Sequence, residues 1–361
     1  FAQTTYANAA FTQVVARGGA VTVAGDFDGD ARTDVAVTGM SGVSAVTIAY
    51  SDGASGQFTV QDSAAAGFSE WATTEDAHVV RGDFDGDATT DLAMVGVGAW
   101  WSIPVAFANG RGAAMTVTNY PAGSFPSWSA TPGIRVAPGD YDGDGLTDIA
   151  LVGGWGWGTV PVAFANGSGD WWVTNGGAGS FPAWAQMPET TLLPGDYDGD
   201  GDTDLALVGV PGWTSIPVAR SNGDGSFTVV NSGLASFPAW AATANVVPLA
   251  ADFDGDGCTD IALSGPIGWG TAPVALGWCT GEFVPYNINA ADFALVSGLG
   301  GEPMPMISNL DSRAAMASIG IPNKSTIPWA GALSGLAFAQ GSPSASTFAP
   351  RTAGAGARLL R

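Results

Sequence analysis

The sequence contains very few basic residues. Lys324 is its only lysine and His78 its only histidine, and lysine and arginine together number 11 against 33 aspartates and glutamates, which gives a formal net charge of −22. Nucleic acids and anionic membranes are held by clusters of basic side chains, so both are poor partners for this chain. The charge favours cations as ligands.

Residues typical of catalysis are also scarce. One histidine, one lysine and five scattered glutamates provide no triad, no recurring acid and base pair and no histidine-bearing metal site. His78 precedes the second acidic motif and is interpreted as a packed or solvated residue. We therefore predict that the protein is not an enzyme.

Long apolar runs are missing too. No stretch approaches the eighteen or so uninterrupted apolar residues needed to cross a bilayer. The first residues, FAQTTYANAA, lack the basic head and apolar centre of a secretory signal peptide, so we expect that any leader has already been removed. With 46% hydrophobic residues, 14 Trp and 17 Phe, the chain can nevertheless bury a large core.

What the sequence does contain is a repeat. One phrase occurs five times, as GDFDGDARTDVAVTG from Gly25, GDFDGDATTDLAMVG from Gly82, GDYDGDGLTDIALVG from Gly139, GDYDGDGDTDLALVG from Gly195 and ADFDGDGCTDIALSG from Ala251. Its first aspartates are spaced by 57, 57, 56 and 56 residues. A further step of 57 reaches Asn309, where the strand pattern continues but Asp311 is the only acid left. We predict six repeats of about 56 residues, the sixth beginning near residue 308 and degenerate.

Each repeat reads as four short strands separated by turns rich in Gly, Asn, Asp and Ser. In the third repeat the predicted strands are 134–138, 148–153, 159–164 and 171–175. No segment shows a sustained helical period, so the fold class is all-β. Four hairpin-linked strands per repeat favour a β-propeller of antiparallel blades, and a β-solenoid is the alternative. Residues 1–340 are predicted to form this single domain.

The acidic motif itself predicts a metal loop. Numbered from its first aspartate, each loop has carboxylates at positions 1, 3, 5 and 9 and can offer a backbone carbonyl at position 7. Two unit charges about 4 Å apart repel by roughly 4 kcal/mol at an effective dielectric near 20, so four clustered carboxylates require a cation or protons. Oxygen ligands alone suit Ca²⁺. Turns without metal are the simpler alternative, but a turn does not need four acids.

The predicted calcium ligands repeat in all five loops. They are Asp26, Asp28, Asp30, Arg32 and Asp34; Asp83, Asp85, Asp87, Thr89 and Asp91; Asp140, Asp142, Asp144, Leu146 and Asp148; Asp196, Asp198, Asp200, Asp202 and Asp204; and Asp252, Asp254, Asp256, Cys258 and Asp260.

The loops resemble an EF-hand at positions 1, 3 and 5 but lack its glutamate at position 12, and a strand follows them in place of a helix. Position 6 is glycine in the last three loops but Ala31 and Ala88 in the first two. We therefore expect weaker calcium binding in those two loops. Five bound ions would reduce the net charge to −12.

The D-x-D-G-D-x-x-x-D loop followed by an apolar strand resembles the FG-GAP or VCBS repeat family, which includes integrin α-subunit propellers and fungal and bacterial propeller lectins. The likeness extends over about residues 1–340. It implies calcium in the loop between the first and second strands of each blade. Because propellers of this family often have seven blades, six repeats leave the closure of the ring open.

Tryptophans are predicted to gather on the face opposite the calcium. In an up-and-down sheet, the second-to-third loops and the connections between blades share that face. Aromatic rings beside amides and hydroxyls suit sugars, although packing between blades is the favoured interpretation for the FPxW tryptophans. The candidate ligand-binding residues are Trp100, Trp101, Trp155, Trp157, Trp213 and Trp269 in the loops, and Trp71, Trp128, Trp184 and Trp240 in the FPxW or FSEW connections.

Three further features complete the prediction. Cys258 and Cys279 fall in two loops on the same face of the fifth repeat, where a disulfide would agree with an oxidising compartment. Asn166 and Asn323 match the N-glycosylation pattern. Residues 341–361 belong to a C-terminal segment in phase with the N-terminus, which suits ring closure or strand exchange with another subunit.

Together these features predict a secreted, calcium-binding, non-enzymatic module that recognises glycans or glycoproteins. The alternative is an extracellular fibre or adhesion protein that assembles from calcium-stabilised propellers.

Overall fold

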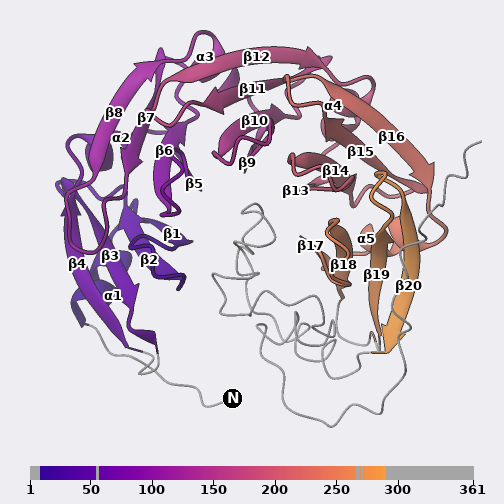
Figure 1. The fold of residues 1–361 in the computed structure, drawn as a ribbon, viewed down its shortest axis with the longest axis horizontal. Coiled ribbons are helices and arrows are strands. Elements are labelled where there is room, and N and C mark those ends of the chain that lie inside the picture. The colour runs from indigo at the N-terminus through magenta and orange to yellow at the C-terminus, as the bar shows by residue number, and fades with distance from the viewer. Residues whose placement is uncertain (1–8, 54–56, 266–268, 270, 290–361) are drawn as a thin grey trace, which may run out of the picture.

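The computed structural model describes residues 9–53, 57–265, 269 and 271–289. They form five four-stranded antiparallel sheets, each with its strands in sequence order. The sheets are arranged as blades around a central axis (Figure 1), with the first strand of each blade innermost and the fourth outermost. The predicted all-β fold of four-stranded propeller blades is confirmed, and the up-and-down strand order distinguishes it from a solenoid.

The twenty strands of the described residues follow the repeat. They are β1 Val21–Gly25, β2 Asp34–Thr38, β3 Ala45–Ser51 and β4 Phe58–Ala64; β5 His78–Gly82, β6 Asp91–Val95, β7 Ser102–Phe107 and β8 Thr116–Pro121; β9 Arg135–Gly139, β10 Asp148–Val152, β11 Thr159–Ala165 and β12 Trp171–Gly177; β13 Thr191–Gly195, β14 Asp204–Val208, β15 Ser215–Ser221 and β16 Phe227–Gly233; and β17 Val247–Ala251, β18 Asp260–Ser264, β19 Thr271–Gly277 and β20 Phe283–Asn289.

The strands of the third repeat lie within two residues of their predicted bounds. The second strand, β10, is buried at every position, and so are β6 and β14. The outermost strand, β12, is buried only at its first residue. A second strand packed on both faces needs apolar residues throughout, which explains the continuous run DIALV in the sequence.

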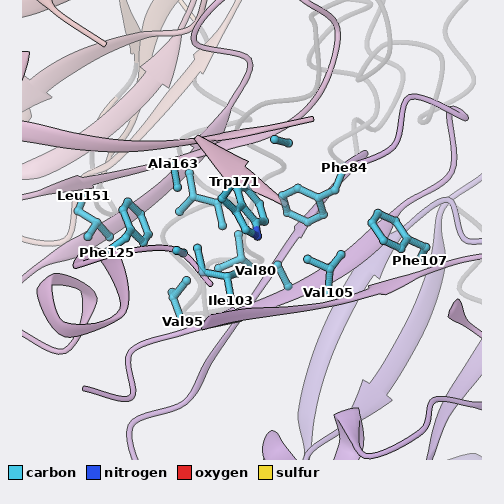
Figure 2. Close-up of a cluster of buried hydrophobic side chains, with 14 residues drawn as sticks. Val80, Phe84, Val95, Ile103, Val105, Phe107, Phe125, Leu151, Ala163 and Trp171 are labelled. Carbon is cyan, nitrogen blue, oxygen red and sulfur yellow. The ribbon is translucent and has the colours of Figure 1, made fainter. Parts of the chain in front are cut away.

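The hydrophobic core lies between blades. One cluster joins Val80 and Phe84 of the second blade to Leu151, Ala163 and Trp171 of the third, and Figure 2 shows Trp171 pointing toward Phe84. The two rings meet edge to face with centroids 5.7 Å apart. The same contact recurs between later blades, from Tyr141 to Phe227 at 6.2 Å and from Tyr197 to Phe283 at 5.7 Å.

Short helices occupy the connections between blades. Beside α1 (Ala9–Val15), these are α2 (Phe68–Trp71), α3 (Phe125–Ser129), α4 (Phe181–Ala185) and α5 (Phe237–Ala241). The first phenylalanine of each of the four connecting helices is fully buried. The sequence did not predict them, because a helix of one turn is too short to display a period. Among the described residues, no helix is both long and apolar enough to cross a membrane.

Neighbouring acidic loops are joined by hydrogen bonds. The threonine at position 8 of one loop donates its N–H to the position-1 carbonyl of the preceding loop, as in Thr147 to Asp83 (2.6 Å) and Thr203 to Asp140 (2.5 Å). Thr147 Oγ1 also accepts a hydrogen bond from the N–H of Asp83 at 3.0 Å. The loops therefore form a continuous hydrogen-bonded chain from blade to blade.

The close contact between neighbouring acidic loops explains why a glycine stands before the loop. A Cβ on Gly82 would lie 2.4 Å from Thr147 Cγ2, and a Cβ on Gly25 would lie 2.5 Å from Thr90 Cγ2. Both distances are shorter than any real contact between such atoms. The glycine is required so that the next blade can approach.

Some predictions concern residues outside those that the structure describes. They are the degenerate sixth repeat near residue 308 with Asn309 and Asp311, the glycosylation site at Asn323 and the C-terminal segment 341–361.

We predict that Gly82→Ala lowers the free energy of unfolding by about 1–3 kcal/mol, because the added methyl group meets the side chain of Thr147. Gly158→Ala is the matched control, since a Cβ there would meet nothing within 4 Å, and it should change stability by less than about 0.5 kcal/mol. Urea unfolding of both variants measures the difference. Equal effects would contradict the close approach of the blades.

Candidate functional site

Each acidic loop is folded around its own first aspartate. In the third loop, Asp140 Oδ1 accepts a hydrogen bond from the N–H of Gly143 at 2.7 Å, and its Oδ2 accepts one from the N–H of Gly145 at 2.9 Å. The other four loops repeat this pair of bonds. The carboxylate at position 1 thus sets the loop's curvature.

Position 6 has a left-handed backbone in every loop. Gly145 has φ of 88°, and Ala31 and Ala88 have φ of 61° and 68°. This conformation is strained for a residue with a Cβ. The two alanine loops therefore keep the same shape as the glycine loops and carry additional strain.

The carboxylate at position 9 ties the loop to the third strand of its blade. Asp148 is fully buried. Its Oδ2 accepts a hydrogen bond from the N–H of Tyr141 at 2.8 Å, and its Oδ1 accepts one from the N–H of Ala165, at the end of β11, also at 2.8 Å. The equivalent aspartates Asp34, Asp91, Asp204 and Asp260 make the same two bonds.

Burial makes these aspartates hard to ionise in the absence of a cation. It is the largest cause that raises the pKa of Asp91, Asp148, Asp204 and Asp260 to about 8, and neighbouring carboxylates raise the pKa further. The pKa of Asp34 rises to about 6, again chiefly through burial. The backbone hydrogen bonds act in the opposite direction.

Three carboxylates converge in each loop. Those of positions 1, 3 and 9 offer oxygens within 4.8 Å of one another, as in Asp140, Asp142 and Asp148. The equivalent groups are Asp26, Asp28 and Asp34; Asp83, Asp85 and Asp91; and Asp196, Asp198 and Asp204. The fifth loop repeats their hydrogen bonds through Asp252 and Asp260.

Position 5 is used differently. Asp144 Oδ1 accepts a hydrogen bond from the N–H of Leu146 at position 7, at 2.9 Å. The equivalent aspartates Asp30, Asp87, Asp200 and Asp256 do the same for Arg32, Thr89, Asp202 and Cys258. The position-5 carboxylate therefore helps to shape the loop. Its role as a calcium ligand stays a prediction.

The carboxylate oxygens at position 3 show where the loops lack hydrogen-bond partners. Asp28 Oδ1, Asp142 Oδ1 and Asp198 Oδ1 are buried and have no hydrogen-bond partner in the part of the chain described. A buried, unpartnered carboxylate oxygen is costly. These hard oxygens, converging in five repeated triads, are consistent with calcium sites. A bound cation would satisfy the unpartnered oxygens and supply the positive charge that the triads need.

The tryptophan loops lie on the other face. The N–H of Gly156 donates to Gln186 Oε1 at 3.0 Å, and Gln186 Nε2 donates to the carbonyl of Trp157 at 3.2 Å. These bonds join the β10–β11 loop to the connection that follows α4. On the face that carries the acidic loops, Arg111 in the β7–β8 turn reaches Asp28 in the β1–β2 loop. The two sets of loops therefore occupy opposite faces.

Most of the predicted tryptophans pack between blades. Each of four clusters receives one FPxW or FSEW tryptophan and one loop tryptophan, all partly buried, in the pairs Trp71 and Trp100, Trp128 and Trp157, Trp184 and Trp213, and Trp240 and Trp269. Trp101 and Trp155 differ, since they are 63% and 85% exposed. They are the loop tryptophans most open to a ligand.

The remaining candidate residues are placed as follows. Cys258 and Cys279 form a disulfide, a bond that indicates an oxidising compartment. Asn166 is exposed in the β11–β12 turn, where its Oδ1 accepts hydrogen bonds from Ser168. His78 is exposed at the start of β5.

Comparison with known proteins identifies the repeat. Residues 196–263 match the FG-GAP-like repeat family. This stretch begins at Asp196 in the fourth loop and ends in β18, so it spans one repeat and the next acidic loop. The remaining acidic loops show the same spacing and hydrogen bonds. A search of curated proteins finds no match.

The fold is similar to that of a lectin of known structure. A structure of an Agrocybe aegerita lectin, described as specifically recognising non-reducing terminal N-acetylglucosamine, is 20% identical with a TM-score of 0.59, and the match covers 78% of this chain and 68% of that chain. The Tc holotoxin pore of Photorhabdus luminescens is 18% identical with a TM-score of 0.47, over 77% of this chain and 13% of that one. At these identities the likeness to the lectin shows a shared fold.

We predict a pH dependence of stability that is present without calcium and absent with it. The folded-state pKa of about 8 for Asp91, Asp148, Asp204 and Asp260 is above the value of about 4 expected in the unfolded chain. Between these values the folded state holds protons that the unfolded state has lost. In chelator, the melting temperature should therefore fall as the pH rises from about 5 to 8.

Calcium should remove this dependence, because it binds the ionised carboxylates and displaces their protons. Calorimetric melting at several pH values, in chelator and in millimolar calcium, makes the comparison. Identical pH profiles in the two conditions would show that no cation binds these groups.

We also predict that Asp148→Asn lowers the calcium stoichiometry by one ion. The asparagine amide keeps one acceptor oxygen but lacks the negative charge that Asp148 contributes to the third loop. Asp170→Asn is the control, because Asp170 is exposed in the β11–β12 turn. Native mass spectrometry counts the ions, and an unchanged count for Asp148→Asn would rule out the third site.

Proposed function

We propose that this protein is a secreted, calcium-binding and non-enzymatic module that recognises glycans with its tryptophan-bearing face. The observation that carries the proposal is the placement of Trp101 and Trp155. Both are exposed, and both lie on loops opposite the acidic loops. An exposed indole ring stacks well on the apolar face of a sugar, whose hydroxyls are left free to form hydrogen bonds.

The loop of Trp155 is suited to present its ring rigidly. Gln186 bonds to both Gly156 and Trp157, the two residues that follow Trp155. Trp157 packs into the cluster between the second and third blades. A loop whose backbone is already held in place loses less conformational entropy when a ligand binds.

The calcium loops would act on the fold and not on the ligand. They lie on the face away from Trp101 and Trp155, and each is tied to its neighbour by the threonine at position 8. Calcium would hold the blades in register, so that the tryptophan loops keep their spacing. Repeated sites on one ring would strengthen weak binding through multivalency.

Two further observations support the proposal. A propeller of similar fold is a lectin described as recognising terminal N-acetylglucosamine, which makes glycans ending in this sugar the first ligands to test. The disulfide between Cys258 and Cys279 agrees with a secreted protein. Asn166, exposed on the calcium face, would carry a glycan without obstructing the tryptophan face.

The test is a glycan array in millimolar calcium that includes chains with terminal N-acetylglucosamine. We predict binding by the wild type and a loss of about tenfold or more in affinity for Trp155→Ala, which corresponds to about 1.4 kcal/mol. Trp278→Ala is the matched control, because Trp278 is 53% exposed but lies in the β19–β20 loop on the calcium face. Absence of wild-type binding to every glycan, or an equal loss in both variants, would contradict the proposal.

A further inference from the structure

The first acidic loop is surrounded by arginines. Arg111, from the β7–β8 turn of the second blade, places Nε 2.8 Å from Asp28 Oδ2 and Nη1 2.9 Å from Asp52 Oδ1. Its Nη2 lies 3.8 Å from Asp30 Oδ2, which also pairs with Arg32. One guanidinium thus bridges three carboxylates of the neighbouring blade.

Arg111 is held in this position by more than charge. Its guanidinium carbon lies 5.1 Å from the centroid of the Tyr50 ring in the first blade, a distance suited to a cation–π contact. The next residue, Gly112, donates its N–H to Tyr50 Oη at 3.3 Å. Gly112 has φ of 71°, and a Cβ there would lie 2.4 Å from Gln61 Oε1. The turn therefore fits closely against the first blade.

The third loop receives the opposite charge from its neighbour. A Cβ on Gly143 would lie 2.6 Å from Asp202 Oδ1, so the carboxylate of the fourth blade rests against the third loop. With Asp52 included, five carboxylates with Arg32 and Arg111 leave the first loop a formal charge of −3. Four carboxylates with Asp202 give the third loop −5. The adjoining side chains make two loops of equal acid content electrostatically unequal.

We infer that Arg111 is a built-in counter-ion for the first acidic loop, which it neutralises from the second blade. The junction between the first two blades therefore holds without metal, and the first loop binds calcium most weakly of the five. Strain at Ala31 acts in the same direction. Asp28 Oδ1 remains buried and unpartnered, so the loop can still accept a cation when calcium is abundant. The inference rests on the calcium binding proposed above.

The test measures calcium affinity in the full chain after removal of metal with a chelator. Titration calorimetry with calcium chloride should resolve one site that is at least about tenfold weaker than any of the other four. Arg111→Gln should tighten the weak site by about tenfold. Adding Asp28→Asn to that variant should abolish the tightened event, which would assign it to the first loop.

Arg17→Gln is the matched control, because it makes the same change in net charge at an exposed residue after α1. It should leave all five affinities unchanged. A second readout is thermal stability: Arg111→Gln should lower the melting temperature by several degrees in chelator, and calcium should restore most of the loss. A purely structural role for Arg111 would give the same loss in both conditions.

Asp52→Asn keeps the inference testable if Arg111→Gln does not fold. It removes the partner of Arg111 that lies outside the acidic loop, so that Arg111 pairs with the loop carboxylates alone, and it should weaken the first site further. Five equal affinities in the wild type, or a weak site that neither variant changes, would overturn the inference. If the wild type binds no calcium at all, the proposed function fails as well, which is a distinct result.

Discussion

Repulsion between carboxylates is the constraint on which the rest of this structure depends. Each acidic loop brings three of them within 4.8 Å of one another and buries the one at position 9. The backbone offers N–H donors to positions 1, 5 and 9, but three of the position-3 carboxylates keep a buried oxygen without a partner among the residues that the structure describes. A divalent cation would supply what the backbone does not, and the threonine bonds between loops would transmit its effect from one blade to the next.

The constraint also separates the two faces of the molecule. Acids occupy the loops at one end of each sheet, where they stabilise the turn between the first two strands. Aromatic residues occupy the loops at the other end, where most of them fill the spaces between blades and Trp101 and Trp155 stay exposed. On the proposed function, the face that carries the acidic loops would serve folding and the opposite face would serve recognition.

Much of this architecture could be predicted from the sequence, because it is local and repeated. The spacing of the acidic motif predicted the blades, and alternating turns and apolar runs predicted the strands of the third repeat to within two residues. The separation of acidic and aromatic loops followed from strand order alone. The closeness of Cys258 to Cys279 followed from the same argument.

Contacts between blades could not be predicted in the same way, because they depend on the angle and distance between sheets. Thr147 and Asp83 are 64 residues apart, and no local pattern shows that they meet. The reach of Arg111 to Asp28 and the packing of Trp157 beside Trp128 are of the same kind. The exposed Trp172 and Trp278 were not singled out either, since a strand or turn tryptophan gives no sequence signal of exposure.

The most direct test of the central claim is a crystal structure determined from crystals grown in millimolar calcium, with anomalous difference density calculated at each acidic loop. The account predicts a peak between the carboxylates of positions 1, 3 and 9 in the loops that begin at Asp83, Asp140, Asp196 and Asp252. Loops that keep this shape but contain only water under those conditions would contradict it.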